Sequence, residues 1–194
     1  LLTGETKKDT VLMFAALLHD IAKPDTTIIE NGCLNAPKHA EKGVEKARAW
    51  LLGMTEDKSL IEAVLPLVRY HGWPRKLYRS DAGDSEILRL STQVCLDDLI
   101  RVAEADYFGR KFVHPLPEKF EAGEWLRGRA AALGVLHEPP PPLLMGRDLI
   151  AMGLSPSERF KRLLDAAYEA QLNLVFSTRP EALAWAEKNL VTVL

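Results

Sequence analysis

The sequence has 194 residues, of which 47% are hydrophobic and 27% are charged, and its formal net charge is -2. A chain of this length can bury one large core, alone or with an appendage. The near-neutral charge argues against a domain that captures nucleic acid over its whole surface, because such domains are usually basic. A local basic face is still compatible with this composition.

The cysteine count and the hydropathy exclude several further classes. Cys33 and Cys95 form no C-x-x-C pair, so neither a zinc finger nor a disulfide scaffold has support. No apolar run reaches the roughly 18 residues of a membrane helix, and the start has no signal-peptide pattern. We therefore expect a soluble cytoplasmic protein with no membrane partner. Because Leu1 and Leu2 look like the end of an earlier element, we also expect the chain to be a fragment.

Helical periodicity dominates the first part of the chain. Apolar residues three and four apart predict a helix from Asp9 or Thr10 to the Lys23-Pro24 step, where proline stops it. A loop containing the β-branched run TTIIE follows, and then a second helix that ends at Gly53. A third helix is predicted around residues 60–68, with a kink at Pro66 and an end near residues 72–74.

The longest helical pattern runs from Ser85 to about Gly109, with an apolar line at alternating steps of three and four. A further helix is predicted over residues 118–133. Two short runs, TTIIE and LVFST, are the only strand signals, and they are too few for a substantial sheet. The sequence therefore predicts an all-α fold.

The composition changes after Gly134, where HEPPPP favours a stiff extended linker. Beyond it the pattern predicts three short helices, over residues 146–152, 156–172 and 180–190. We therefore divide the chain into a helical domain, a proline-rich linker and a helical C-terminal region, at residues 1–134, 135–143 and 144–194.

The stretch FAALLHDIAKP sets an apolar run directly against His19 and Asp20. Inside a regular helix, two neighbouring side chains diverge by roughly 100° and cannot converge on one point. At a helix C-terminus the turn loosens, and the negative end of the dipole favours a cation. An imidazole beside a carboxylate at such a place predicts a metal site, which suits manganese, iron, zinc, nickel or magnesium.

Three more side chains fall where they could face the same core. His39 stands in the first turn of the second helix, His71 ends the apolar stripe of the third, and Asp106 continues the stripe of the long helix. Asp97 lies about 180° round that helix from Asp106, so we expect only Asp106 to point inward. An unpaired buried carboxylate is costly, so Asp106 needs a cation, an arginine or hydrogen-bond donors.

Each of these residues has an ordinary structural explanation when it is taken singly. A lone histidine at a helix end is more often a cap or a core residue, and Asp106 could equally pair with Arg101 or Arg110. The joint pattern favours the metal site, because the candidates fall at core-facing or terminal positions of four separate helices. The candidate ligands are His19, Asp20, His39, His71 and Asp106.

HDIAKP, the two later histidines and an AEAD that ends in Asp106 resemble the HD superfamily of metal-dependent phosphohydrolases. The resemblance implies an HD-domain helical bundle that binds one or two divalent metal ions and hydrolyses a phosphomonoester or phosphodiester on a nucleotide or RNA end. His19, Asp20 and Asp106 match the HD pair and the final Asp, while His39 and His71 match the extra histidines of two-metal members. The family's first histidine lies upstream of the pair, and no histidine precedes His19 here. The resemblance therefore implies either a ligand upstream of Leu1 or an incomplete site.

The C-terminal region carries a second resemblance. LLMGRDLIAMGL, AYEAQL and EAL, together with the earlier EADYFGR, resemble the C-terminal part of bacterial CCA-adding tRNA nucleotidyltransferases and poly(A) polymerases that carry an HD domain. The family's Pro-Gly turn after GL is replaced here by SPSERF. The nucleotidyltransferase head, with its Gly-Ser and paired-Asp motif, is missing from the sequence. We therefore do not expect this chain alone to add nucleotides, and the implied partner is a nucleotide or RNA, including tRNA.

Candidate catalytic and substrate-binding residues follow from the same resemblance. Asp20 and Lys23 are the candidate catalytic residues, and Lys23 lies close enough to the HD pair to approach a phosphate. The candidate substrate-binding residues are Lys23, Arg75, Lys76 and Arg110. A solvated lysine at a helix end is an equally good explanation of Lys23.

Two other functions are compatible with the sequence. The first is an RNA-holding body and tail of a tRNA nucleotidyltransferase with a vestigial HD site, because WPRKLYRS interleaves aromatic rings (Trp73 and Tyr78) with cations (Arg75, Lys76 and Arg79). The second is a plain helical interaction module, which explains the apolar stripes but not the convergence of histidine and aspartate.

Overall fold

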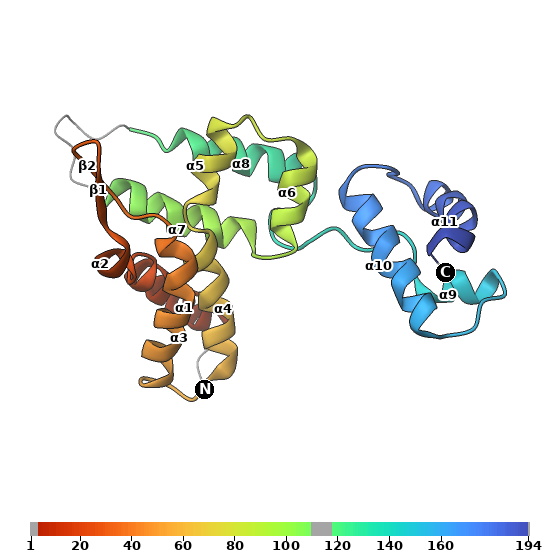
Figure 1. The fold of residues 1–194 in the computed structure, drawn as a ribbon, viewed down its shortest axis with the longest axis horizontal. Helices are drawn as coiled ribbons and strands as arrows, with labels where there is room; N and C mark the ends of the chain where they lie inside the picture. Colours follow the sequence, from red (N-terminus) through yellow and green to blue (C-terminus); the bar gives the residue numbers. More distant parts are fainter. Residues whose placement is uncertain (1–3, 110–117, 194) are drawn as a thin grey trace. The chain divides into compact units, whose positions relative to one another are not determined.

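The computed structural model describes residues 4–109 and 118–193, which form helices and one small β-hairpin (Figure 1). These residues fall into two compact units, and the boundary along the chain lies between Glu138 and Pro139. The all-α prediction is confirmed. The finer division at residues 134 and 144 stays a prediction. Within the described ranges, no helix is both long enough and apolar enough to cross a membrane.

The first unit consists of eight helices and a hairpin within its described part. Its elements are α1 (Gly4–Leu18), α2 (Lys23–Thr26), β1 (Ile28–Glu30), β2 (Cys33–Asn35), α3 (His39–Leu52), α4 (Lys58–Tyr70), α5 (Trp73–Arg79), α6 (Asp84–Ser91), α7 (Leu96–Phe108) and α8 (Glu121–Ala132). Helix α4 contacts α1, α3 and α7, while α8 contacts α5, α6 and α7 (Figure 1). The ends of α1 and α4 are thereby fixed near one flank of α7.

Helix α4 is the central element of this packing. Its apolar stripe is buried, with Val64 and Val68 both at 0% exposure. Each such side chain contributes roughly 1.5–3 kcal/mol through burial. The Asp57 carboxylate caps the helix by accepting a hydrogen bond from the Leu60 amide at 3.0 Å. The helix runs through Pro66 to Tyr70, so its buried face holds the following residue, His71, in a fixed place.

The single long helix predicted over residues 85–109 is wrong, because the chain forms α6 and α7 instead. The Ser91 and Thr92 hydroxyls donate hydrogen bonds to the carbonyls of Leu88 and Arg89, which ends α6. Cys95 then takes an extended conformation and precedes α7. The apolar steps of three and four continue across this break, so the periodicity could not reveal it.

Two boundaries beside prolines also differ from the predictions. Helix α1 ends at Leu18 instead of reaching Pro24, which lies in the first turn of the short α2. The third helix ends as expected, but Trp73 and Pro74 begin α5 instead of a loop. Proline fits the first turn of a helix because no intrahelical hydrogen bond is lost there. Both prolines therefore mark helix starts.

Of the two strand signals, one is right. TTIIE contains β1, which pairs antiparallel with β2 in the register Ile29 to Leu34. Strand β2 has no clear strand pattern of its own, although the Asn31-Gly32 turn between the strands, with both φ angles positive, is a strong hairpin signal. The LVFST stretch forms no strand in the described structure. Its first residue, Leu174, has a φ of 59° in the turn that follows residue 172.

The second unit comprises α9 (Gly146–Ala151), α10 (Glu158–Leu172) and α11 (Arg179–Val193). It has its own small core, formed by Leu144, Leu149, Leu163, Ala167, Ala170, Phe176, Ala182 and Ala186. The proline run packs on α10, because Tyr168 and Gln171 donate hydrogen bonds to the carbonyls of Pro140 and Pro141, both at 2.9 Å. Part of the predicted linker is therefore attached to this unit.

Candidate metal centre

His19 and Asp20 follow directly after α1, which is anchored by the buried Ala15 and Leu18. The His19 amide still donates to the Ala15 carbonyl at 2.9 Å, and the chain then turns before α2 begins. This loosened turn lets the two adjacent side chains face each other. His19 Nε2 lies 3.2 Å from Asp20 Oδ2.

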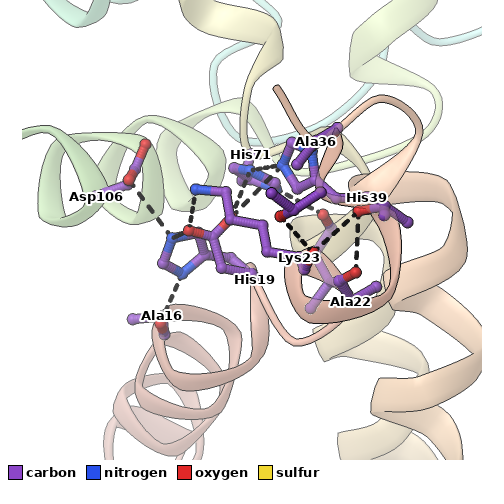
Figure 2. Close-up of polar contacts among 12 residues, drawn as sticks. Ala16, His19, Ala22, Lys23, Ala36, His39, His71 and Asp106 are labelled. Atoms are coloured by element: carbon purple, nitrogen blue, oxygen red, sulfur yellow. Dashed lines mark hydrogen bonds and ion pairs between the residues drawn. The ribbon is translucent and has the colours of Figure 1, made fainter. Parts of the chain in front are cut away.

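Two further histidines reach the same carboxylate (Figure 2). His39 is the first residue of α3, and His71 is the C-cap of α4 and is 5% exposed. Their Nε2 atoms lie 3.5 Å and 3.8 Å from Asp20 Oδ1. The two Nε2 atoms are 3.3 Å apart. Asp20, which follows the end of α1, thus lies close to the start of α3 and to the end of α4.

Asp106 completes the cluster from α7. Its Oδ1 lies 3.4 Å from His19 Nε2, and its side chain is only 10% exposed. Two groups of three side chains can each direct ligand atoms to one point, all within 4.8 Å of one another: Asp20, His39 and His71, and His19, Asp20 and Asp106. Asp20 belongs to both groups. The structure therefore brings together all five of the predicted ligands.

The hydrogen bonds of the three Nδ1 atoms determine which nitrogen of each ring can face a metal. The Nδ1 atoms of His19, His39 and His71 contact the carbonyls of the third residues before them at 2.7, 2.7 and 2.8 Å. A carbonyl only accepts, so each Nδ1 must be the donor, and Nε2 of a neutral ring then holds a lone pair. Two such lone pairs, those of His39 and His71, face each other. A hydrogen bond cannot join two acceptors, but a cation between them can.

Asp20 supplies a second reason to place a cation here. Its Oδ2 accepts a hydrogen bond from Lys23 Nζ at 2.5 Å (Figure 2). Its Oδ1 is buried and has no hydrogen-bond partner within the described parts of the chain. A buried carboxylate oxygen without such a partner is costly, and here it faces two imidazole nitrogens. The donor set of nitrogen and carboxylate oxygen fits a divalent transition metal.

The electrostatics of the cluster are those of closely spaced opposite charges. Burial lowers the pKa of His19, but its hydrogen bonds to Asp106 and Asp20 outweigh burial and raise this pKa to about 10. Burial raises the pKa of Asp20, but His19 and Lys23 hold it well below its usual range. Burial and the nearby charge of His19 lower the pKa of His71, which favours the neutral ring that binds metals.

A cavity of about 500 Å³ adjoins the cluster. It is lined by Lys23, His39, His71, Gly72, Arg75, Lys76, Arg79 and Ser80. Four of these side chains are cationic and none of the described lining residues is a carboxylate, so the cavity complements an anion. The cationic cavity, as we call it, contains three of the four predicted substrate-binding residues. The fourth, Arg110, lies outside the described residues.

Sequence reasoning did not assign Arg79 to this cavity. The sequence predicts that the chain leaves its helix before this residue, whereas α5 places Arg79 one turn after Arg75 and Lys76. The relevant signal is Pro74 in WPRKLYR, because a proline can begin a helix as readily as it can end one. The same helix sets Lys76 Nζ over the Trp73 ring, 4.4 Å from its centroid.

The prediction that Asp97 points outward is wrong. Asp97 is 4% exposed, and it contacts Arg127 of α8, Arg101 at 3.4 Å and Lys8 at 3.8 Å. The helical-wheel argument assumed one buried face, but α1, α4 and α8 all pack on α7. A carboxylate on the side opposite to Asp106 is therefore also covered.

The sequence matches the HD domain family over residues 2–111. It is 35% identical over 178 residues to the CC-adding tRNA nucleotidyltransferase of Thermus thermophilus, which covers 88% of this chain and 38% of that protein. It is 28% identical over 202 residues to the A-adding tRNA nucleotidyltransferase of Deinococcus radiodurans, covering 97% of this chain and 44% of that protein. The chain spans about two fifths of the length of these curated relatives. No solved structure matches it.

These comparisons agree with the geometry of the cluster. The match to the family covers more than half of the chain and includes the five converging side chains, from His19 to Asp106. The predicted resemblance to tRNA nucleotidyltransferases is confirmed as a distant homology over most of the chain. The chain therefore belongs to the HD domain family.

Proposed function

We propose that this chain is the metal-dependent phosphohydrolase part of a tRNA nucleotidyltransferase-like protein, and that it hydrolyses a phosphomonoester or phosphodiester on a nucleotide or RNA end. The main support is the convergence of three Nε2 atoms on Asp20, whose Oδ1 has no hydrogen-bond partner among the described residues. This convergence lies beside a cavity whose lining is cationic. A site for divalent cations next to a site for anions suits a phosphate ester better than a neutral substrate.

The proposed metal sites share Asp20. His39 and His71 would complete one of them, and His19 and Asp106 would complete the other. Manganese, nickel, magnesium, iron or zinc would suit this mixture of nitrogen and oxygen ligands to different degrees. When bound, such an ion lowers the pKa of a water molecule and neutralises charge on phosphoryl oxygens.

The chain's own cations would then bind and orient the substrate. Lys23 Nζ donates a hydrogen bond to Asp20 Oδ2 at 2.5 Å, and Lys23 also lines the cationic cavity. Its ammonium group would therefore lie between the ligand cluster and a phosphate bound in the cavity. Arg75 and Lys76 line the same cavity and would donate hydrogen bonds to phosphate oxygens. Lys23 is the candidate proton donor to the leaving oxygen, with Asp20 as the carboxylate that positions it.

The test combines metal analysis with hydrolysis assays. The purified chain is titrated with Mn²⁺, Ni²⁺ and Mg²⁺, and its turnover of a 2′,3′-cyclic nucleotide and of p-nitrophenyl phosphate is measured with each ion. We expect bound metal and metal-dependent hydrolysis that Asp20→Asn abolishes. The matched control is Asp25→Asn, which changes an exposed carboxylate in α2 that pairs with Lys46. If neither metal binding nor turnover occurs with any of the three ions, the proposal is wrong.

A second function, RNA binding by a body with a vestigial HD site, is favoured by α5. This helix carries Trp73, Lys76 and Arg79 on seven residues, and the two relatives are named for their action on tRNA. This function predicts tRNA binding that weakens with salt, with a logarithmic slope of about 0.7–0.9 for each phosphate that the protein neutralises. Neutralising Arg75, Lys76 and Arg79 together should reduce both the affinity and the slope, whereas Asp20→Asn should change neither.

A further inference from the structure

A second cavity, of about 360 Å³, lies among α5, α7 and the start of α8. Its lining consists of Arg75, Tyr78, Arg79, Tyr107, Lys119, Phe120, Glu121 and Ala122. Arg75 and Arg79 line this aromatic cavity, as we call it, and also the cationic cavity beside the metal cluster. The two cavities are therefore neighbours that share a wall of two guanidinium groups.

The aromatic rings of this cavity are held in place by their own contacts. Tyr107 and Phe120 are stacked, with centroids 4.9 Å apart and ring planes 29° apart. The Tyr78 hydroxyl donates to Glu121 Oε2 at 3.2 Å, and its ring meets Trp125 edge-on at 5.9 Å. Tyr78 is nevertheless 40% exposed, so much of its ring can accept a ligand. Rings that are already ordered lose little conformational entropy when a planar group stacks on them.

The charges of the two cavities differ in a way that orients a ligand. The cationic cavity has no carboxylate among its described lining residues, whereas the aromatic cavity contains Glu121. A phosphate group is therefore better placed beside the metal cluster, because Glu121 offsets one of the three cations, Arg75, Arg79 and Lys119, that line the aromatic cavity. A planar, uncharged group with N–H donors suits the aromatic cavity, because it can stack on the rings and donate to the carboxylate.

We propose that the aromatic cavity binds the nucleobase of the molecule whose phosphate occupies the cationic cavity. Its volume lies within the range of small-molecule sites and suits a nucleoside portion. Aromatic and guanidinium planes are the usual stacking partners of bases. The inference rests on the proposed function and adds to it a separate site for the base of the nucleotide or RNA end. Tyr78 is the principal stacking residue, and Glu121 positions its ring.

Three ligands separate the contributions of base and phosphate. AMP, ribose 5-phosphate and adenosine are titrated into the chain by isothermal calorimetry in the presence of Mn²⁺. We expect AMP to bind about tenfold more tightly than ribose 5-phosphate, because stacking of one base on an aromatic side chain is typically worth roughly five- to 150-fold in affinity. Tyr78→Leu should remove this tenfold difference and leave the affinity for ribose 5-phosphate unchanged.

Two further variants exclude a general effect on folding. Tyr78→Phe keeps the ring and loses only the hydrogen bond to Glu121, so it should retain most of the preference for AMP. Trp50→Leu removes a 37% exposed aromatic ring that is not among the described lining residues of either cavity, and it should bind all three ligands like the unmodified chain. Thermal unfolding of each variant checks that the fold is kept.

The outcomes distinguish this inference from the proposed function. Equal affinities for AMP and ribose 5-phosphate would overturn the nucleobase site and leave phosphate binding intact. Adenosine binding that Tyr78→Leu abolishes, with no binding of ribose 5-phosphate, would support the nucleobase site and contradict the phosphohydrolase. Binding of none of the three ligands would overturn both proposals. A preference for AMP that survives Tyr78→Leu would also overturn the inference, because the base would then lie elsewhere.

Discussion

The two ends of α7 use buried carboxylates in opposite ways. At its first turn, Asp97 is surrounded by the cations Arg127, Arg101 and Lys8. Near its last turn, Asp106 faces His19, which in turn contacts Asp20. The protein itself neutralises the charge at the first end. At the second end, the carboxylates face imidazoles whose Nδ1 atoms are already bonded to carbonyls.

This difference separates a structural ion pair from a candidate ligand cluster. Arginine and lysine have only donors to offer, so the site around Asp97 is complete as it stands. In their neutral forms His39 and His71 direct lone pairs at each other, and Asp20 Oδ1 has no hydrogen-bond partner in the described structure, so this part of the cluster can accept a cation. Burial alone would have ranked Asp97 first, since its side chain is 6% exposed against 30% for Asp20. The partners of a buried carboxylate therefore indicate its role better than its burial does.

The largest expected effect is the loss of metal affinity when Asp20 is replaced. Asp20→Asn removes the carboxylate that both ligand groups share, so we expect the affinity for Mn²⁺ to fall at least 100-fold, or about 2.7 kcal/mol. The free energy of unfolding without metal should fall only modestly, through the lost contacts of Asp20 Oδ2 with Lys23 and His19, because the Asp20 side chain is 30% exposed. Calorimetric titration and urea unfolding in EDTA measure the two quantities. An Asn variant that binds Mn²⁺ as tightly as the unmodified chain would exclude Asp20 as a ligand.

The second prediction is the reverse pattern at the other end of α7. Asp97→Asn leaves Arg127 and Arg101 without their shared anion, while Lys8 keeps Asp98 at 3.0 Å, so the free energy of unfolding should fall by about 2 kcal/mol. This is less than for a fully buried pair, because the three cations are 42–50% exposed. Affinity for Mn²⁺ should stay within about a factor of two. Loss of metal binding without loss of stability would contradict the structural role of Asp97.

The comparison of Asp20 with Asp97 also shows which features of the site could be predicted from the sequence. Each of the five converging residues was identifiable, because a histidine or aspartate at a helix end or on an apolar stripe leaves a local pattern. Asp97 could not be assigned, since its burial depends on α8, which begins only at Glu121. A helical wheel describes one helix, whereas Asp97 also contacts Lys8 of α1 and Arg127 of α8.

The fold itself shows the same limit. The all-α class and most helices follow from periodicity, because an amphipathic stripe is a property of one segment. The break between α6 and α7 does not follow, because the apolar periodicity continues across it. The start of α5 at Trp73 does not follow either, because a proline can end a helix or begin one. The cationic cavity was therefore predicted only in part, because Arg79 was expected on an RNA-contacting surface and not among the residues that bind the hydrolysed substrate.

A third, smaller effect concerns Lys23, which contacts the cluster without belonging to either ligand group. Lys23→Gln removes the charge that faces the cationic cavity, and we expect kcat/KM for a 2′,3′-cyclic nucleotide to fall at least about tenfold. Affinity for Mn²⁺ should change much less than kcat/KM does. If the variant instead loses metal and activity in parallel, Lys23 acts by positioning Asp20 and does not act on the substrate.

The smallest expected effect is a pH dependence at the structural end of α7. Burial raises the pKa of Asp97, but Arg127, Arg101 and Lys8 outweigh burial and hold it below the ordinary value of 3.8. The unfolded chain therefore takes up this proton first as the pH falls. The stabilisation by Asp97 should be fully present above the ordinary pKa and should be lost as the pH falls through the lower, folded-state value. Because other carboxylates titrate in the same range, the measurement is the difference in unfolding free energy between the unmodified chain and Asp97→Asn, in EDTA, from about pH 6 to about pH 3. This difference should narrow with acidification, and a difference that stays constant would show that the ion pairs of Asp97 contribute nothing to stability.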